Sequence, residues 1–175
     1  MVNNMNIEKT MFYRGSSHKR ISINEVIKII SDYIKSDPTA SYELTIGTDS
    51  QSFKDISKIV EVIALCRKGN GGIFFYNTDR VQKFKYLRDK IYEETSRSIE
   101  LADYLFKECE DSFKDNGVDF NEIDINFEIH CDVGHKGKTN ELIQEITGWV
   151  IACGYTPVTK PDSYAASAVA DKFSK

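Results

Sequence analysis

Hydrophobic and polar positions divide the chain into segments with helical or strand-like spacing. Ser22 and Glu25 have the spacing of a capping box, and the segment that they open carries apolar residues at helical intervals as far as Ile34. Asp37-Pro38 should end this helix, because the residue before a proline disfavours helical backbone. Residues 1–20 are polar and irregular, so we expect an arm or an edge segment there.

Three strand-like segments follow the first helix. Tyr42–Thr48 is the first, and Ile59–Arg67, which is rich in β-branched residues, is the second. Gly69-Asn70-Gly71-Gly72 is a strong hairpin turn before the third segment, Ile73–Asn77. The pattern therefore predicts an antiparallel meander of three strands.

The second half of the chain alternates helices with strands. The expected elements are a long helix over Tyr86–Phe113, a strand over Ile125–Cys131, a helix over Thr139–Cys153, a strand over Tyr155–Thr159 and a last helix over Asp162–Phe173. This order predicts an α/β fold, with a mixed five-stranded sheet flanked by helices and an extra N-terminal helix. We expect a single domain, in which residues 1–40 form an arm and helix packed on residues 41–175.

Composition limits the function only weakly. The 175 residues suffice for one domain with a core, and the net charge of −4 gives no overall basic field, although a local basic rim could still bind phosphates. No apolar run reaches transmembrane length, and the N-terminus lacks the regions of a signal peptide. The four cysteines form no Cys-x-x-Cys pair and lie in apolar contexts. We therefore expect a reduced cytoplasmic protein with buried free thiols and no membrane partner.

Two aspartates follow strand-like segments at the points where each should end. Asp49 comes directly after Thr48 and shares a strand face with Gly47. Asp132 lies opposite in phase to Cys131, which belongs to the apolar face of its strand. Ligands of α/β folds favour the carboxyl ends of strands, although an ordinary strand-to-loop aspartate is the alternative for Asp132.

Helical phase selects two further carboxylates. At about 100° per residue, Glu94 falls in the middle of the apolar face of the long helix, whereas Glu93 and Glu100 fall off it. A flanking glutamate that reaches solvent is the alternative. Asp162 projects along the apolar face of the last helix and Asp171 points away, but a carboxylate in the first turn of a helix also favours the helix dipole without further function.

These four carboxylates form an all-oxygen set. Hard cations such as Mg²⁺ and Mn²⁺ prefer oxygen ligands, whereas zinc is not expected because the chain has no cluster of histidine and cysteine ligands. Two such ions can activate water and stabilise the leaving oxygen in phosphodiester cleavage. We therefore expect two Mg²⁺ or Mn²⁺ ions, and the residues predicted to bind them and to carry the catalysis are Asp49, Glu94, Asp132 and Asp162.

The loop after the fourth strand carries a competing motif. Its ending, Gly137-Lys138-Thr139, is similar to the phosphate-binding loop of nucleotide hydrolases, but the glycine required five positions earlier is Asp132, which would repel phosphates. A plain polar loop with Thr139 as a helix N-cap is another alternative. We favour contacts with nucleic-acid phosphates beside the metal ions. The residues predicted to bind the substrate are Gln51, His135, Lys136, Lys138 and Thr139.

A second basic stretch lies at the start of the long helix. It contains Lys83, Lys85, Arg88 and Lys90. Such a run is expected to be a solvated helix face.

Three blocks of the sequence carry a resemblance to a known family. They are Ile46–Gln51, His130–Gly134 with Gly137-Lys138-Thr139, and Lys160–Ser167 with Val169–Lys172. They resemble the YkuK-type family, which is assigned to the ribonuclease H-like superfamily, and the resemblance covers about residues 40–175. The superfamily implies three antiparallel strands, a helix, and then alternating parallel strands and helices.

The resemblance also implies where the acidic residues lie. It implies a carboxylate on the first strand, matching Asp49, and one on the helix after the hairpin strands, where Glu94 is selected by phase. It implies another at the end of the fourth strand, matching Asp132, and one that opens the last helix, matching Asp162.

Three functional hypotheses follow. The first is a metal-dependent nuclease acting on RNA, DNA or a hybrid, in which Lys136 and Lys138 position the strand. The second is a non-catalytic nucleic-acid-binding module on the same fold. The third is a nucleotide hydrolase that uses Gly137-Lys138-Thr139.

Overall fold

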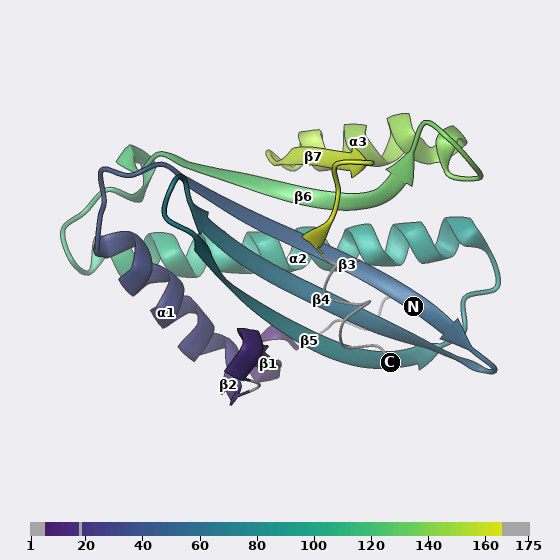
Figure 1. Ribbon diagram of the computed structural model, residues 1–175, viewed down its shortest axis with the longest axis horizontal. Helices are drawn as coiled ribbons and strands as arrows, with labels where there is room; N and C mark the ends of the chain where they lie inside the picture. The colour runs from purple at the N-terminus through teal and green to yellow at the C-terminus, as the bar shows by residue number, and fades with distance from the viewer. Residues whose placement is uncertain (1–5, 18, 166–175) are drawn as a thin grey trace.

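The computed structural model describes residues 6–17 and 19–165, which form a mixed sheet with helices packed on it (Figure 1). The strands of the sheet are β1 (Met11–Arg14), β2 (Lys19–Ser22), β3 (Tyr42–Phe53), β4 (Ile56–Arg67), β5 (Gly72–Gln82), β6 (Ile125–Gly134) and β7 (Thr156–Lys160). The helices are α1 (Ile23–Lys35), α2 (Leu87–Lys114) and α3 (Ile143–Ala152), with short 3-10 turns at Ile7–Lys9, Gly15–Ser17, Phe120–Glu122 and Asn140–Leu142.

The strand order across the sheet is β2-β1-β5-β4-β3-β6-β7. β3, β4 and β5 form the antiparallel meander, and β6 and β7 join it in parallel to β3. The α/β fold class was predicted from the hydrophobic pattern and is confirmed, as is the order of the main elements from α1 to β7. Ser22 caps α1 in a capping box with Glu25, also as predicted.

Other boundaries differ from the prediction. The segment expected to be an irregular arm contains β1 and β2, so the sheet has two strands more than expected. β3 continues to Phe53, five residues past Thr48, because its whole length pairs with β4. Of the four cysteines, Cys109 and Cys131 are buried as expected, but Cys66 is half-buried and Cys153 is exposed. Residues 166–175, which include most of the last predicted helix and Asp171, lie outside the described residues.

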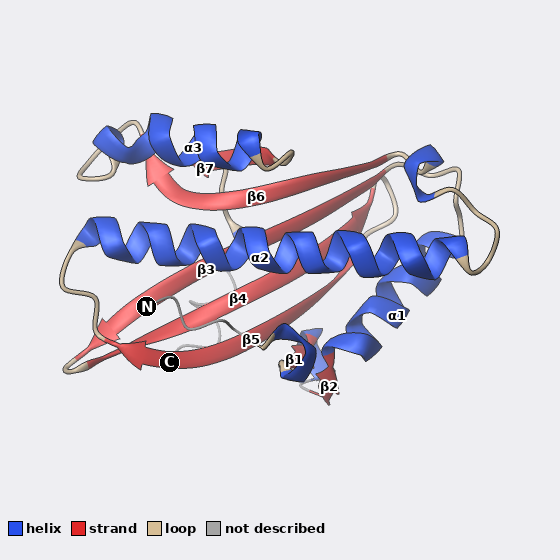
Figure 2. Cartoon of the chain, turned by 180° about the vertical axis from the view of Figure 1, so that it is seen from behind, coloured by secondary structure: helices blue, strands red, loops and turns tan. Residues whose placement is uncertain are grey.

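The three helices pack on one face of the sheet, where α2 crosses β3, β4 and β5 (Figure 2). The main core lies between them and includes Leu44 and Ile46 of β3 with Leu101 and Leu105 of α2. A smaller apolar cluster occupies the opposite face, where Ala165 packs with residues of β4 and β5. The chain after β7 crosses to this face in front of the sheet in Figure 1.

A partly buried ion cluster fixes α2 against the β4–β5 hairpin. Arg97 donates to Oε1 of Glu93 at 2.8 Å and to Oδ2 of Asp79 at 3.0 Å. Its Nη1 also lies 3.9 Å from Oε1 of Glu61, a carboxylate that is 1% exposed. Because Arg97 follows Glu94 by three residues, nearly one helical turn, this cluster also fixes the rotation at which α2 presents Glu94 to the sheet.

Glu61 should make the stability of the protein depend on pH. Burial raises the pKa of Glu61 from its ordinary value of 4.5 to about 6, against the opposing effects of Arg97 and of a hydrogen bond from Asn77. The folded protein therefore holds this proton more tightly than the unfolded chain does. The contribution is fully present below pH 4.5 and is lost as pH rises through about 6, which amounts to about 2 kcal/mol.

Glu61→Gln should remove this part of the pH dependence. The free energy of unfolding, measured with urea at about pH 4.5 and about pH 7, should fall less across the interval in the variant than in the wild type. Glu122→Gln, at an exposed position, is the matched control and should keep the wild-type dependence. An unchanged dependence in Glu61→Gln would show that Glu61 titrates normally in the fold.

Candidate metal centre

Parallel pairing of β3 with β6 places two aspartates side by side. The last residue pair between these strands is Gly47 with His130. Asp49 and Asp132 each lie two residues beyond that pair, so both project to the same face where the strands part. Their side chains are 18% and 22% exposed. Both aspartates lie inside their strands and not at the strand ends that the sequence suggested, but they lie beyond the carboxyl end of the parallel pairing.

Glu94 reaches the same place from α2. Its side chain is 3% exposed, so it lies on the buried face of the helix as helical phase predicted. Ser50 of β3 donates to Oε1 of Glu94 at 2.7 Å, whereas Oε2 is buried without a hydrogen-bond partner. One turn further along α2, the hydroxyls of Thr48 and Ser98 hydrogen-bond at 2.8 Å and hold the helix against the strand. Burial raises the pKa of Glu94 to about 8.

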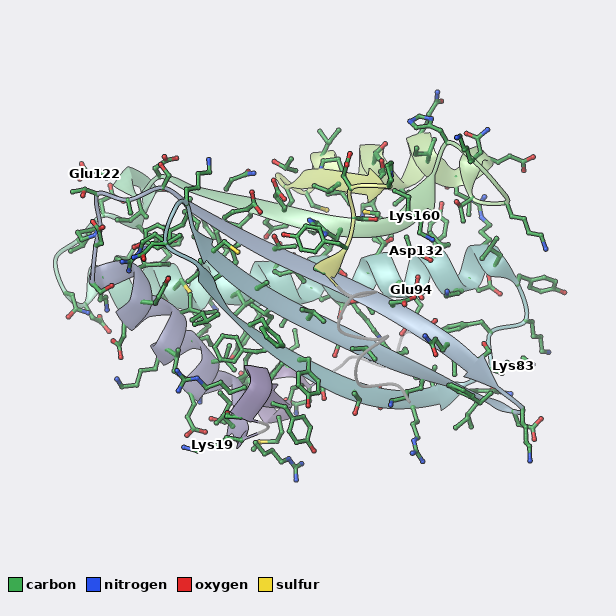
Figure 3. The ribbon with its side chains drawn as sticks, in the orientation of Figure 1. Lys19, Lys83, Glu94, Glu122, Asp132 and Lys160 are labelled. Carbon is green, nitrogen blue, oxygen red and sulfur yellow. The ribbon has the colours of Figure 1, made fainter. Side chains whose placement is uncertain are left out.

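The structure brings three of the four predicted carboxylates together. Asp49, Glu94 and Asp132 each place a carboxylate oxygen within 4.8 Å of the other two, and Figure 3 shows Glu94 and Asp132 converging from α2 and β6. Burial raises the pKa of Asp49, and the charge of Asp132 adds to that increase. Carboxylates this close repel one another, so the arrangement requires positive charge nearby.

Two lysines that the sequence analysis did not assign to the site supply such charge. The Nζ of Lys90 lies 3.7 Å from Asp49, 3.5 Å from Glu94 and 3.8 Å from Asp132. Lys160, at the end of β7, lies 2.5 Å from Asp132. Burial alone would lower the pKa of Lys90, but the charges of these carboxylates outweigh it and raise the pKa.

The expectation that Lys90 belongs to a solvated helix face is therefore wrong. Its side chain is 22% exposed and turns toward the carboxylates. The signal that could have found it is its spacing, because Lys90 precedes Glu94 by four residues and residues so spaced are neighbours on a helix. Arg88, two residues earlier, does lie at the surface and pairs with Glu145 of α3.

Asp162 does not join the three carboxylates. It lies exposed in the turn after β7, and it is not part of the group whose oxygens approach within 4.8 Å. The residues that follow it, Ser163–Ala165, line a small pocket together with Asp49 and Asp132. The structure thus places the segment that carries Asp162 beside the site, with its carboxylate outside the group.

His130 attaches this segment to the sheet. Its Nδ1 accepts the backbone N–H groups of Tyr164 at 3.1 Å and Ala165 at 3.2 Å, and its Nε2 lies 3.4 Å from Glu128. Burial lowers the pKa of His130, which favours the neutral ring that this acceptor role requires. His130 therefore holds the chain after β7 next to Asp132.

The predicted substrate-binding residues lie on β3 and in the loop after β6, and this loop differs from a phosphate-binding loop. Thr139 does not cap a helix, because its Oγ1 instead accepts the backbone N–H of Gly134 at 3.1 Å and closes the loop. α3 begins only at Ile143, so the Gly-Lys-Thr run does not open a helix as that motif requires. Gln51 is half-buried on β3, on the same strand face as Asp49. The exposed residues of the loop include His135, Lys136 and Lys138.

The donor set fits a hard divalent cation. Asp49, Glu94 and Asp132 offer only carboxylate oxygens, the ligands that Mg²⁺ and Mn²⁺ prefer. Oε2 of Glu94 is a buried acceptor without a hydrogen-bond partner, and such atoms are rare unless a ligand, an ion or water satisfies them.

Comparison with known proteins agrees with this architecture. The family model described as Ribonuclease H-like matches residues 25–175. The uncharacterized protein YkuK of Bacillus subtilis (strain 168) is 34% identical over 168 residues, which cover 94% of this chain and 97% of that protein. No solved structure matches the chain. Within the described residues, none of the helices has the length and apolar character needed to cross a membrane. The extent of these two matches shows that the chain belongs to the YkuK-type family of ribonuclease H-like proteins.

Proposed function

We propose that the protein is a metal-dependent nuclease that hydrolyses phosphodiester bonds in nucleic acid. The observation that carries the proposal is the convergence of Asp49, Glu94 and Asp132 within 4.8 Å of one another on a ribonuclease H-like fold. The buried, unpartnered Oε2 of Glu94 supports it further, because a structural carboxylate would be expected to have both oxygens satisfied.

Each residue has a distinct role in this proposal. Asp49, Glu94 and Asp132 hold Mg²⁺ or Mn²⁺, whereas the carboxylate of Asp162 lies outside this group. When bound, the divalent ion supplies Lewis-acid activation of water and stabilises charge on the leaving oxygen. Ser50 orients the carboxylate of Glu94 by donating to Oε1.

The surface around the carboxylates supplies the contacts for the nucleic acid. Lys136 and Lys138 are exposed in the loop after β6, four and six residues past Asp132, and in this proposal their ammonium groups contact phosphates of the bound strand. His135 is exposed in the same loop, and Gln51 is half-buried on β3, two residues past Asp49. The protein as a whole is acidic, so this local group provides the positive charge that a phosphate backbone requires.

A non-catalytic nucleic-acid-binding module is the second candidate. The observation that favours it is Lys90, whose ammonium lies within 4 Å of all three carboxylates and balances part of their charge without a metal ion. Turnover separates the two functions. Binding that persists in a chelator, without cleavage of any single-stranded, duplex or hybrid substrate in Mn²⁺, would favour the module.

Asp49→Asn should abolish Mn²⁺-dependent cleavage. The amide keeps the size of the side chain but removes the charge that holds the ion, so the cleavage rate should fall by more than about 100-fold, the scale of losing one electrostatic contact to the transition state. Cleavage of fluorescent RNA, DNA and hybrid oligonucleotides measures the effect, and circular dichroism verifies the fold.

Asp55→Asn is the matched control for this experiment. Asp55 is an exposed aspartate in the turn between β3 and β4, so its amide should leave the rate unchanged. Cleavage by Asp49→Asn at the wild-type rate would remove Asp49 from the catalytic site.

Lys136→Ala with Lys138→Ala should weaken nucleic-acid binding to a similar degree for all sequences. Each lost phosphate contact should reduce the slope of log affinity against log salt by about 0.9 for duplex DNA. Fluorescence anisotropy in a chelator measures binding without cleavage. Lys107→Ala is the control, because Lys107 is exposed on α2, about 20 Å along the helix axis from Glu94. An unchanged salt slope in the double variant would place the nucleic acid elsewhere.

A further inference from the structure

Lys90 occupies the position of a cation among the three carboxylates. Its Nζ lies between 3.5 and 3.8 Å from an oxygen of each, and its side chain is 22% exposed. The position follows from the helix, since Lys90 precedes Glu94 by one turn of α2 and both side chains face β3 and β6. Lys90 is thus part of the same cluster as the carboxylates and not an outer neighbour of it.

The charge balance of the cluster depends on this lysine. A bound metal ion requires ionised carboxylate ligands. In that form Asp49, Glu94 and Asp132 carry three negative charges, and Lys90 and Lys160 return two positive charges. One divalent ion then changes the local balance from −1 to +1. A second would bring it to +3 before any phosphate is present, in a partly buried site where uncompensated charge is costly.

The number of available carboxylate oxygens also disfavours a second ion. Paired metal ions in phosphodiester-cleaving sites lie about 3.5–4 Å apart and share carboxylate ligands. The three ligand oxygens here lie within 4.8 Å of one another, and Lys90 already approaches all three carboxylates. A second ion and the ammonium of Lys90 would therefore compete for the same oxygens.

We propose that Lys90 is a built-in cation of this centre, so that the protein without nucleic acid binds one divalent ion at the carboxylates and not two. The inference rests on the proposed metal site and adds the number of ions and the residue that limits it. In this arrangement the first ion shares the carboxylates with Lys90. Removing the charge of Lys90 opens the position of a second ion and strengthens the binding of the first.

Mn²⁺ titration of the protein alone tests the proposal. Isothermal calorimetry, with electron paramagnetic resonance of free Mn²⁺, gives the number of bound ions without any cleavage assay. The wild type should bind one ion, and this binding should be lost in Asp49→Asn. Lys90→Met, which keeps the length of the side chain, should bind two ions and should hold the first at least about 10-fold more tightly, since a competing charge has been removed.

Two further variants distinguish the effect of the positive charge of Lys90 from the effect of altering the helix. Lys90→Arg keeps the positive charge and should keep the single ion. Lys107→Met removes a lysine charge from an exposed part of the same helix and should bind Mn²⁺ like the wild type. Thermal unfolding in a chelator verifies that each variant is folded.

The possible failures are distinguishable. Two ions in the wild type, or one ion of unchanged affinity in Lys90→Met, would overturn the role of Lys90 and leave the proposed nuclease intact. If neither the wild type nor Lys90→Met binds Mn²⁺, or if Asp49→Asn does not reduce the binding, the metal site is excluded and the proposed function with it.

Discussion

The parallel pairing of β3 with β6 is the contact on which the carboxylate site depends. It joins residues 42–47 to residues 125–130, two segments that β4, β5 and α2 separate along the chain. Its register is strict, because a slip of one residue would turn every side chain of one strand to the other face. Such a slip would separate Asp49 from Asp132. The same pairing places α2 across the sheet beside the point where the strands part, so that Glu94 approaches both aspartates.

Packing of α2 completes the geometry at a cost in stability. Glu94 is buried, and its raised pKa shows that the fold disfavours its charged form. Neighbouring contacts hold it in place nonetheless: the hydrogen bond from Ser50, the pair of Thr48 with Ser98, and the Arg97 cluster. Side chains held this firmly in an unfavourable environment are typical of functional sites. The polar contacts of α2 therefore make most sense as support for Glu94.

Periodic patterns in the sequence could predict the fold and part of the site. Two-residue and 3.6-residue spacing identified the main elements, and helical phase selected Glu94 from its neighbours. β1 and β2 were not predicted because each has only four residues, with Phe12 and Ile21 as the buried apolar positions. Short strands at an edge carry too few residues for alternation to be visible.

Tertiary contacts explain what the sequence could not provide. The spacing of four residues makes Lys90 a neighbour of Glu94 on the helix, but its contacts with Asp49 and Asp132 depend on what β3 and β6 bring opposite α2. The position of Asp162 depends on how the chain turns after β7, where His130 accepts the backbone N–H groups of Tyr164 and Ala165. No periodic spacing in the sequence indicates such a contact. Glu61 did carry a signal, because it is a charged residue within the apolar run of β4, and its buried partner Arg97 accounts for it.

The two lysines change how the site should be understood. In many metal centres the ligands repel one another until an ion binds, and binding is then coupled to folding. Here strand register, helix packing and the charges of Lys90 and Lys160 hold the three carboxylates together within the protein itself. Under our proposal, an arriving ion changes the charge of a preformed group and does not assemble it. The affinity of the ion is then determined by competition with Lys90, and a negatively charged phosphate that approached the site would relieve that competition by attracting the ammonium group.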